Sequence, residues 1–137
     1  ANKTHEVSIG HGLLVLLGNT QSDTTEDLDW LLNKIIHMRI FNDEVAVMNK
    51  SVLDVAGELL IVSQFTLYAQ TKKGNRPSYI RAAGHEIAVP LYPHFLQKAN
   101  QLMGNPVQSG IFGADMHTAL TNDGPVTIII DSKNKDL

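Results

Sequence analysis

The hydrophobic positions of this chain follow helical spacing in two long stretches. The first stretch predicts an amphipathic helix over Thr24–Arg39, in which the apolar side chains recur on one face: Leu28, Leu31, Leu32, Ile35 and Ile36. Asp23 is the predicted N-cap of this helix, with Glu26 reaching back to it. The second stretch predicts a helix over His85–Met103. Pro90 and Pro93 should kink its first turns or convert them to 3₁₀ geometry.

Other hydrophobic residues form short continuous runs that predict strands. The two longest lie in Gly12–Gly18 and Glu58–Ala69, and a final strand is expected at Val126–Asp131. Shorter candidates are Val45–Met48, Ser51–Val55, Val107–Gly110 and Met116–Thr121. The mixture predicts an α+β fold with two principal helices and a mainly antiparallel or mixed sheet, not a βαβ series. The polar tail Ser132–Leu137 is expected to fray.

Composition narrows the class of protein. The chain has 137 residues, 43% hydrophobic and 18% charged, which predicts one globular domain with a substantial core. It has no cysteine, so disulfides and thiolate zinc sites are excluded. No stretch resembles a membrane span or a secretory leader, so we expect a cytoplasmic protein. The net charge of −3 argues against coating of nucleic acid over a broad basic face.

Two polar segments interrupt the apolar runs. Ser63-Gln64-Phe65-Thr66 follows Leu59–Val62, and Asn122–Pro125 precedes the final run. Buried polar groups are costly unless they are satisfied, and a strand that opens with Gly-Pro gives up a ladder donor. Two such departures in one small domain predict a functional site.

Conventional catalytic groups are hard to assemble from this sequence. The six histidines have no recognised metal-ligand spacing, so we expect no metal and no other cofactor. Thr66 could be a nucleophile, but no base can be assigned to it, and we favour a structural or site-lining role. The basic group Lys72, Lys73 and Arg76 is, from composition alone, most simply a solvated loop.

The polar segments also carry a resemblance. SQFTLYAQTKKGNRPSY at 63–79, FGADM at 112–116 and TNDGPVT at 121–127 resemble the D-aminoacyl-tRNA deacylase (D-tyrosyl-tRNA deacylase) family. GLLVLLG, MRIF and MNKSVLD also match, in family order and across almost the whole chain. Family members open with a strand containing Gln-Arg-Val, which is absent here, so the bracing role of its arginine is assigned to no residue.

The resemblance implies a barrel-like deacylase fold and a chiral proofreading hydrolase. It would cleave the ester of D-aminoacyl-tRNA, and of glycyl-tRNA mischarged on tRNA-Ala, while rejecting L-aminoacyl esters. Ser63, Gln64, Phe65 and Thr66 would line the catalytic site, largely through their backbone. The resemblance further implies a homodimer, in which a cis Gly124-Pro125 peptide enters the partner's pocket as the chirality filter. The tRNA 3′ end would be held by these residues: Lys72, Lys73, Arg76, Phe112 and Met116.

Two alternatives remain open from the sequence. A non-catalytic module that binds a nucleotide or small ligand would explain the missing nucleophile–base pair. A related deacylase acting on L-alanyl mischarged tRNA would hold Gly124-Pro125 trans, and the intact SQFT and NDGPVT segments argue against it. Phe112 and Met116 are as easily explained as core residues.

Overall fold

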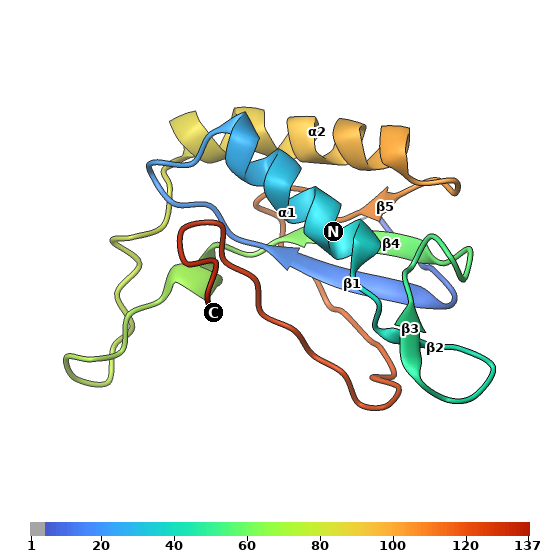
Figure 1. Ribbon diagram of the computed structural model, residues 1–137. Coiled ribbons are helices and arrows are strands. Elements are labelled where there is room, and N and C mark those ends of the chain that lie inside the picture. Colours follow the sequence, from blue (N-terminus) through green and yellow to red (C-terminus); the bar gives the residue numbers. More distant parts are fainter. Residues whose placement is uncertain (1–4) are drawn as a thin grey trace.

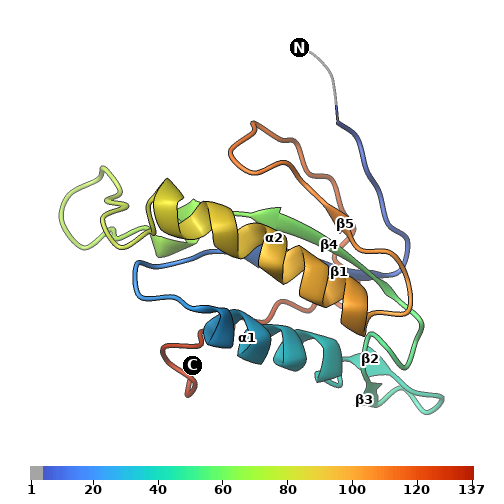
Figure 2. The ribbon, with the colours of Figure 1, turned by 90° about the horizontal axis from the view of Figure 1, so that it is seen from above.

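The computed structural model describes residues 5–137, with both α helices on one side of a small parallel sheet (Figures 1 and 2). The sheet contains β1 (Gly12–Leu17), β4 (Glu58–Ser63) and β5 (Gln108–Ser109), in the order β1-β4-β5. Both strand pairs are parallel, and Gly12 to Leu17 run in register with Glu58 to Ser63. β4 is therefore the central strand.

Helices cross between the parallel strands. α1 (Thr25–His37) lies between β1 and β4 in the chain, and α2 (His85–Leu102) lies between β4 and β5. Since parallel neighbours need a crossover, this order explains why both helices cover one face. β2 (Phe41–Asn42) and β3 (Met48–Lys50) form a separate antiparallel pair.

The expected sheet arrangement is therefore wrong in two respects. The main sheet is parallel and built from strand–helix–strand units, and antiparallel pairing in the described residues is limited to β2 with β3 and two isolated bridges, Thr20 with Ala82 and Gln70 with Ser78. The strands of residues 5–137 also do not close into a barrel, because three of them form an open sheet and two a separate one. The α+β class and the two principal helices are confirmed.

α1 begins one residue later than expected, at Thr25. Thr24 is the N-cap, and its backbone N–H donates to the Asp27 carboxylate, 2.9 Å away, in a capping box. Asp23 uses its own carboxylate on the preceding turn, where Oδ2 accepts the Thr20 N–H at 3.0 Å. In α2, Pro90 and Pro93 lie inside an uninterrupted α helix, so the expected 3₁₀ start is also wrong.

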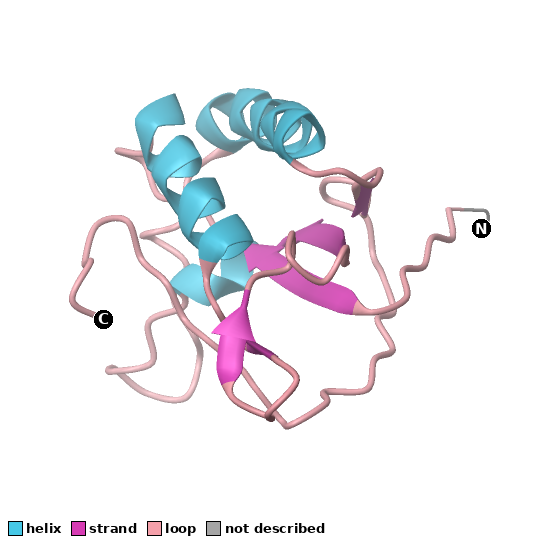
Figure 3. Ribbon diagram, turned by 45° about the vertical axis from the view of Figure 1, so that its right-hand side comes forward, coloured by secondary structure: helices cyan, strands magenta, loops and turns pink. Residues whose placement is uncertain are grey.

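The hydrophobic core lies between the helices and one face of the sheet. Helices contribute side chains every three or four residues and strands contribute every second one. The fully buried side chains include these: Leu28, Leu32 and Ile36 of α1, Phe95 and Ala99 of α2, and Leu59 and Ile61 of β4. Leu60 and Val62 alternate with these on β4 and face the other side of the sheet, where they line a groove. In the described part of the chain, α1 and α2 both lie on the side of the sheet opposite to that face (Figure 3).

Several predicted strands are shorter than expected or have no partner. β4 stops at Ser63 rather than Ala69 and is followed by the 3₁₀ helix η1 (Phe65–Tyr68). Residues 52–56 form turns where a strand was expected at 51–55, β3 covers 48–50 instead of 45–48, and 107–110 contains only the two residues of β5. Residues 116–121 and 126–131 pair with no strand in the described part of the chain. In residues 5–137 we find no helix with the length and apolar character that crossing a membrane requires.

The C-terminal tail is anchored rather than frayed. Lys133 donates to the carbonyl oxygen of Ser22 at 3.2 Å and to the Asp27 carboxylate at 3.0 Å. The ammonium group of Lys135 lies 4.8 Å from the ring centroid of Trp30. Residues 131–137 are thereby held against the start of α1.

Candidate active site

The segment Ser63–Thr66 lies where β4 ends and η1 begins. Ser63 is the last ladder residue of β4, and the Gln64 N–H donates to the carbonyl of Leu17 at 2.7 Å. The chain then turns, with the Leu67 N–H bonded to the Gln64 carbonyl at 3.2 Å. The polar residues therefore end the central strand, beside the end of β1.

Backbone donors are available at this turn. In a 3₁₀ helix the first N–H groups have no partner within the helix, so those of Phe65 and Thr66 precede its first i→i+3 bond. The Gln64 N–H is already occupied by Leu17. The donors expected around 63–66 thus reduce to Phe65 and Thr66.

Thr66 has a side-chain partner but no base. Its half-buried hydroxyl is hydrogen-bonded to the side-chain amide of Gln64. The ring contacts found among the histidines lie elsewhere: His5 with Ser109, His11 with Phe41, His37 with Asn33, His85 with Phe112, and His94 with Asp29. This arrangement favours the site-lining role predicted for Thr66.

The segment Asn122–Thr127 forms a separate, exposed turn. The Asn122 side chain holds it closed, since Oδ1 accepts the Val126 N–H at 3.0 Å and Nδ2 donates to the Thr127 hydroxyl at 3.0 Å. The Gly124–Pro125 peptide is cis, as expected, and Gly124 has φ +125°. A Cβ at Gly124 would lie 2.9 Å from Cγ2 of Val126, so a side chain does not fit this conformation without movement.

No hydrogen bond joins these two segments in the described part of the chain. In Figure 1 the orange-red chain that carries residues 121–127 turns below the sheet, at the end opposite η1. Gly124 and Pro125 are both exposed. One copy of the chain therefore keeps the two expected halves of the site apart.

Phe112 and Met116 also lie apart from each other. Phe112 packs on the helix side, with ring centroids 5.7 Å from His85 and 5.8 Å from Tyr92. Met116 covers Gly110 and lines a groove of about 1110 Å³ on the opposite side of the sheet. In this chain Phe112 and Met116 therefore lie on opposite sides of the sheet and do not form one surface for a terminal adenine.

Tyr92 is a buried residue next to the candidate site that the sequence pattern did not single out. Its hydroxyl, on α2, lies 3.1 Å from the Ile61 carbonyl and 3.0 Å from the Gly110 carbonyl. It therefore ties the helix to β4 just before Ser63 and to the segment leading to Met116. A tyrosine on an apolar helix face is weak evidence by itself, so no sequence signal marked it.

The basic loop is exposed and closed at its base. Gln70 and Ser78 exchange two backbone hydrogen bonds, of 2.8 and 2.9 Å, and Lys72, Lys73 and Arg76 project from the loop between them. None of these three cations forms an ion pair with a described residue. Their charge is available to a partner.

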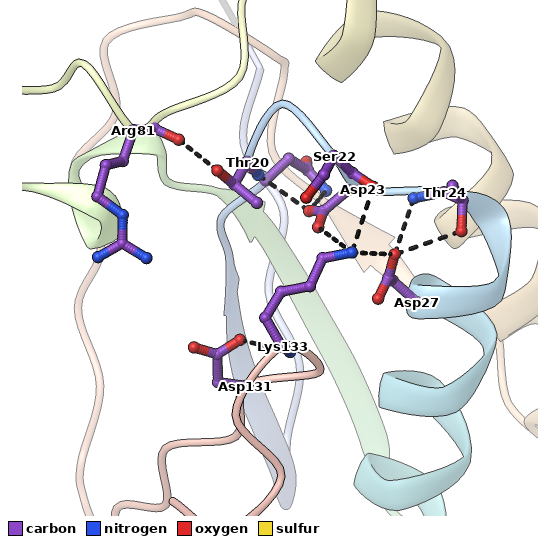
Figure 4. Close-up of polar contacts among 9 residues, drawn as sticks. Thr20, Ser22, Asp23, Thr24, Asp27, Arg81, Asp131 and Lys133 are labelled. Carbon is purple, nitrogen blue, oxygen red and sulfur yellow. Dashed lines mark hydrogen bonds and ion pairs between the residues drawn. The ribbon is translucent and has the colours of Figure 1, made fainter.

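Arg81, which follows the basic loop, contacts a cluster of polar and charged side chains near the start of α1 (Figure 4). The Thr20 hydroxyl donates to the carbonyl of Arg81 at 2.5 Å, and the Arg81 guanidinium lies 5.6 Å from the ring centroid of Tyr68. Burial raises the pKa of Tyr68 to about 12, and the carboxylates of Asp23 and Asp131 add to the rise. Tyr68 therefore stays protonated at neutral pH.

Two carboxylates of this cluster, those of Asp23 and Asp27, differ in the direction of their pKa shifts. Burial raises the pKa of Asp23, whose Oδ1 is buried without a hydrogen bond from residues 5–137 and lies 3.8 Å from Nζ of Lys133. Burial would also raise the pKa of Asp27, but the Thr24 N–H and the Lys133 ammonium outweigh it and lower that pKa. Asp27 is thus the better-stabilised anion of the pair. Residues 5–137 contain no group of three or more His, Asp or Glu side chains placed to hold a metal ion.

Together, these features define a small α+β protein with a polar turn ending its central strand and an exposed Gly-Pro turn on a separate segment. A model of the D-Tyr-tRNA(Tyr) deacylase family matches residues 1–131. The chain belongs to that family.

Individual relatives agree with this assignment. The D-aminoacyl-tRNA deacylase of Parabacteroides distasonis is 58% identical, over 93% of this chain and 85% of the relative. That of Christiangramia forsetii is 63% identical, over 90% and 83%.

Solved structures resemble the fold. A c-Myc DNA unwinding element binding protein is 41% identical, with a TM-score of 0.82 over 88% of this chain and 81% of its own. A probable eukaryotic D-amino acid tRNA deacylase is 17% identical, with a TM-score of 0.67 over 78% and 77%, and shows likeness of fold alone.

Proposed function

We propose that this protein hydrolyses the ester that joins a D-amino acid to the 3′-terminal ribose of tRNA, releasing the free amino acid and tRNA. Membership of the deacylase family over residues 1–131 carries this proposal. Since the proposed substrate is a tRNA, the proposed compartment is the cytoplasm. Glycyl-tRNA is a second proposed substrate, because glycine has no side chain for a chirality filter to exclude.

The Ser63–Thr66 turn supplies the proposed catalytic surface. Ester hydrolysis develops negative charge on the carbonyl oxygen, and preorganised N–H donors stabilise that charge. The free N–H groups of Phe65 and Thr66 fit this requirement. A hydroxyl of the substrate's own ribose would assist the attacking water, which is consistent with the absence of a base beside Thr66.

The Gly124-Pro125 turn supplies the proposed chirality filter, donated by a second copy of the chain. Its exposure and its separation from Ser63–Thr66 within one chain support a site assembled across a homodimer. Backbone groups close to the substrate's α-carbon would exclude L-aminoacyl esters by shape. Gly124 permits that approach because it carries no Cβ.

The direct test compares D-tyrosyl-tRNA, L-tyrosyl-tRNA and glycyl-tRNA as substrates. We expect rapid release of D-tyrosine and glycine, with L-tyrosyl-tRNA left intact. Intact D-tyrosyl ester despite binding would support a non-catalytic nucleic-acid binder, a reading that the name of the 41% identical neighbour also suggests. Faster release of L-alanine from mischarged tRNA would favour the L-alanyl deacylase.

Complementation tests the shared site. Gly124→Ala alters the filter, and Thr66→Pro removes one proposed oxyanion donor, so each variant alone should be inactive. In an equal mixture of subunits, half the dimers pair the two variants, and one of their two sites is intact. About one quarter of the wild-type activity should then return. No recovery on subunit exchange would place the site within one chain.

A further inference from the structure

Two aromatic side chains from different segments meet on the surface beside the basic loop. Phe65 of η1 and Tyr79, just after the loop, lie with ring centroids 5.0 Å apart and planes at 70°. Phe65 is 56% exposed and Tyr79 is 40% exposed. Large aromatic side chains are usually buried, so an exposed pair held in contact suggests a surface that binds a ligand.

The charge around this pair favours an anionic ligand. Between Glu58 and Glu86 the chain contains no Asp or Glu, yet it holds four of the eleven Lys and Arg residues. These are Lys72, Lys73, Arg76 and Arg81. In a chain with a net charge of −3, this segment alone carries four positive charges and no negative one. Exposed aromatic rings flanked by cations are the combination that binds single-stranded nucleic acid, since rings stack on bases and cations pair with phosphates.

The backbone holds the pair in place. The paired Gln70 and Ser78 position Tyr79 at the exit of the loop, and the Ala82 N–H donates to the Tyr79 carbonyl at 3.0 Å. Phe65 is fixed by the turn that ends β4. The aromatic pair therefore lies directly beside the proposed oxyanion donors.

We propose that Phe65 and Tyr79 form a stacking platform for unpaired bases at the 3′ end of the RNA substrate. The platform rests on the proposed function and adds to it a contact to the RNA rather than to the amino acid. Bases stacked on the rings would run toward the basic loop, where Lys72, Lys73 and Arg76 would meet their phosphates. The terminal ester would then enter the Ser63–Thr66 turn.

The test uses uncharged RNA, so that it is independent of hydrolysis. The probes are a hairpin RNA with a short unpaired 3′ overhang and the same hairpin with a blunt end. Tyr79→Ala should weaken binding to the overhang probe by about 5- to 100-fold, the range for loss of an aromatic stacking partner. Binding to the blunt probe should not change. Tyr79→Phe should keep the wild-type affinity because it keeps the ring.

Ile80→Ala is the matched control, since Ile80 is the neighbouring residue, is apolar and is 79% exposed. It should bind both probes as the wild type does. The Tyr79→Ala variant should also keep the wild-type salt slope, because stacking releases no counterions.

Unchanged overhang binding by Tyr79→Ala would refute the platform, as would an equal loss with Ile80→Ala. A change in oligomeric state by light scattering, with RNA binding intact, would instead assign the pair to a contact between copies of the chain. The proposed function is tested by a separate measurement, the hydrolysis of D-tyrosyl-tRNA by the wild type. An intact ester in that assay would contradict the function without bearing on the platform.

Discussion

Replacing Tyr92 with phenylalanine removes one buried hydroxyl and leaves the shape of the core unchanged. The hydroxyl proton is shared between the carbonyls of Ile61 and Gly110, at 3.1 and 3.0 Å. The Ile61 carbonyl keeps a partner in the variant, because it also accepts the Gly110 N–H at 2.9 Å. The Gly110 carbonyl, which is partly buried, loses the hydroxyl.

The expected loss follows from that inventory. One hydrogen bond contributes about 1 kcal/mol net, and a carbonyl left partly unsatisfied adds to the cost, so Tyr92→Phe should destabilise the protein by about 1–2 kcal/mol. Tyr92→Ala should cost about 3–5 kcal/mol, because it also leaves a cavity among side chains that include Phe112.

Urea unfolding at fixed protein concentration measures both variants, since the proposed homodimer would make the stability depend on concentration. Tyr79→Phe is the control, because its ring is 40% exposed and its change in stability should stay within about 0.5 kcal/mol. A urea midpoint of Tyr92→Phe equal to that of Tyr79→Phe would refute the claim that the Tyr92 hydroxyl stabilises the fold by linking α2 to the Ile61 and Gly110 carbonyls.

The pH dependence gives a second check with a defined sign. Burial raises the pKa of Tyr92 above its ordinary value of 10.0. The folded state therefore holds the phenolic proton more tightly than the unfolded state. The stabilisation is complete below pH 10 and is lost as the pH rises through the folded pKa. The cost of Tyr92→Phe should be constant near neutral pH and shrink only in strong alkali.

Three further predictions concern charge and catalysis. Replacing Lys72, Lys73 and Arg76 by alanine should raise KM with little change in kcat and flatten the salt dependence of tRNA binding, and an unchanged slope would make the loop only solvated surface. Thr66→Val should retain substantial deacylation, whereas an aminoacyl ester trapped on Thr66, or a loss of about 10⁶-fold, would identify it as a nucleophile. Asp27→Asn should lower the urea midpoint at neutral pH, and its difference from the wild type should vanish as the pH falls through the lowered folded pKa of Asp27. A difference that persists in acid would show that the charge of Asp27 does not stabilise the fold.

The helices were predictable because their signals are local. Apolar side chains at helical spacing located α1 and α2 to within two residues at each end. The cap of α1 was displaced by one residue because Asp23 and Thr24 are both good caps. A tertiary contact decides between them, since the Asp23 carboxylate is used by the turn at Thr20.

The sheet was less predictable because strand pairing is not local. An apolar run shows that Leu59–Val62 is buried but does not show which strand lies beside it or in which direction. The run was also extended too far, since the polar residues from Ser63 onward end the strand and begin η1. The residues of 126–131 have strong strand propensity but no partner among residues 5–137, and propensity alone does not supply one.

The candidate site was likewise predictable in its local segments and not in the way they are placed together. Its segments are marked in the sequence by local departures, because a strand that ends in Ser-Gln and a turn that contains Gly-Pro break the patterns around them. Their relation in space depends on the whole fold, and within one chain the Asn122–Thr127 turn does not pair with β4 as a strand. Tyr79 shows the opposite case, since it breaks no pattern and only the closed loop between Gln70 and Ser78 brings its ring to 5.0 Å from that of Phe65. A sequence therefore identifies segments whose chemistry is unusual, whereas a site built from ordinary residues becomes visible only when the fold places them together.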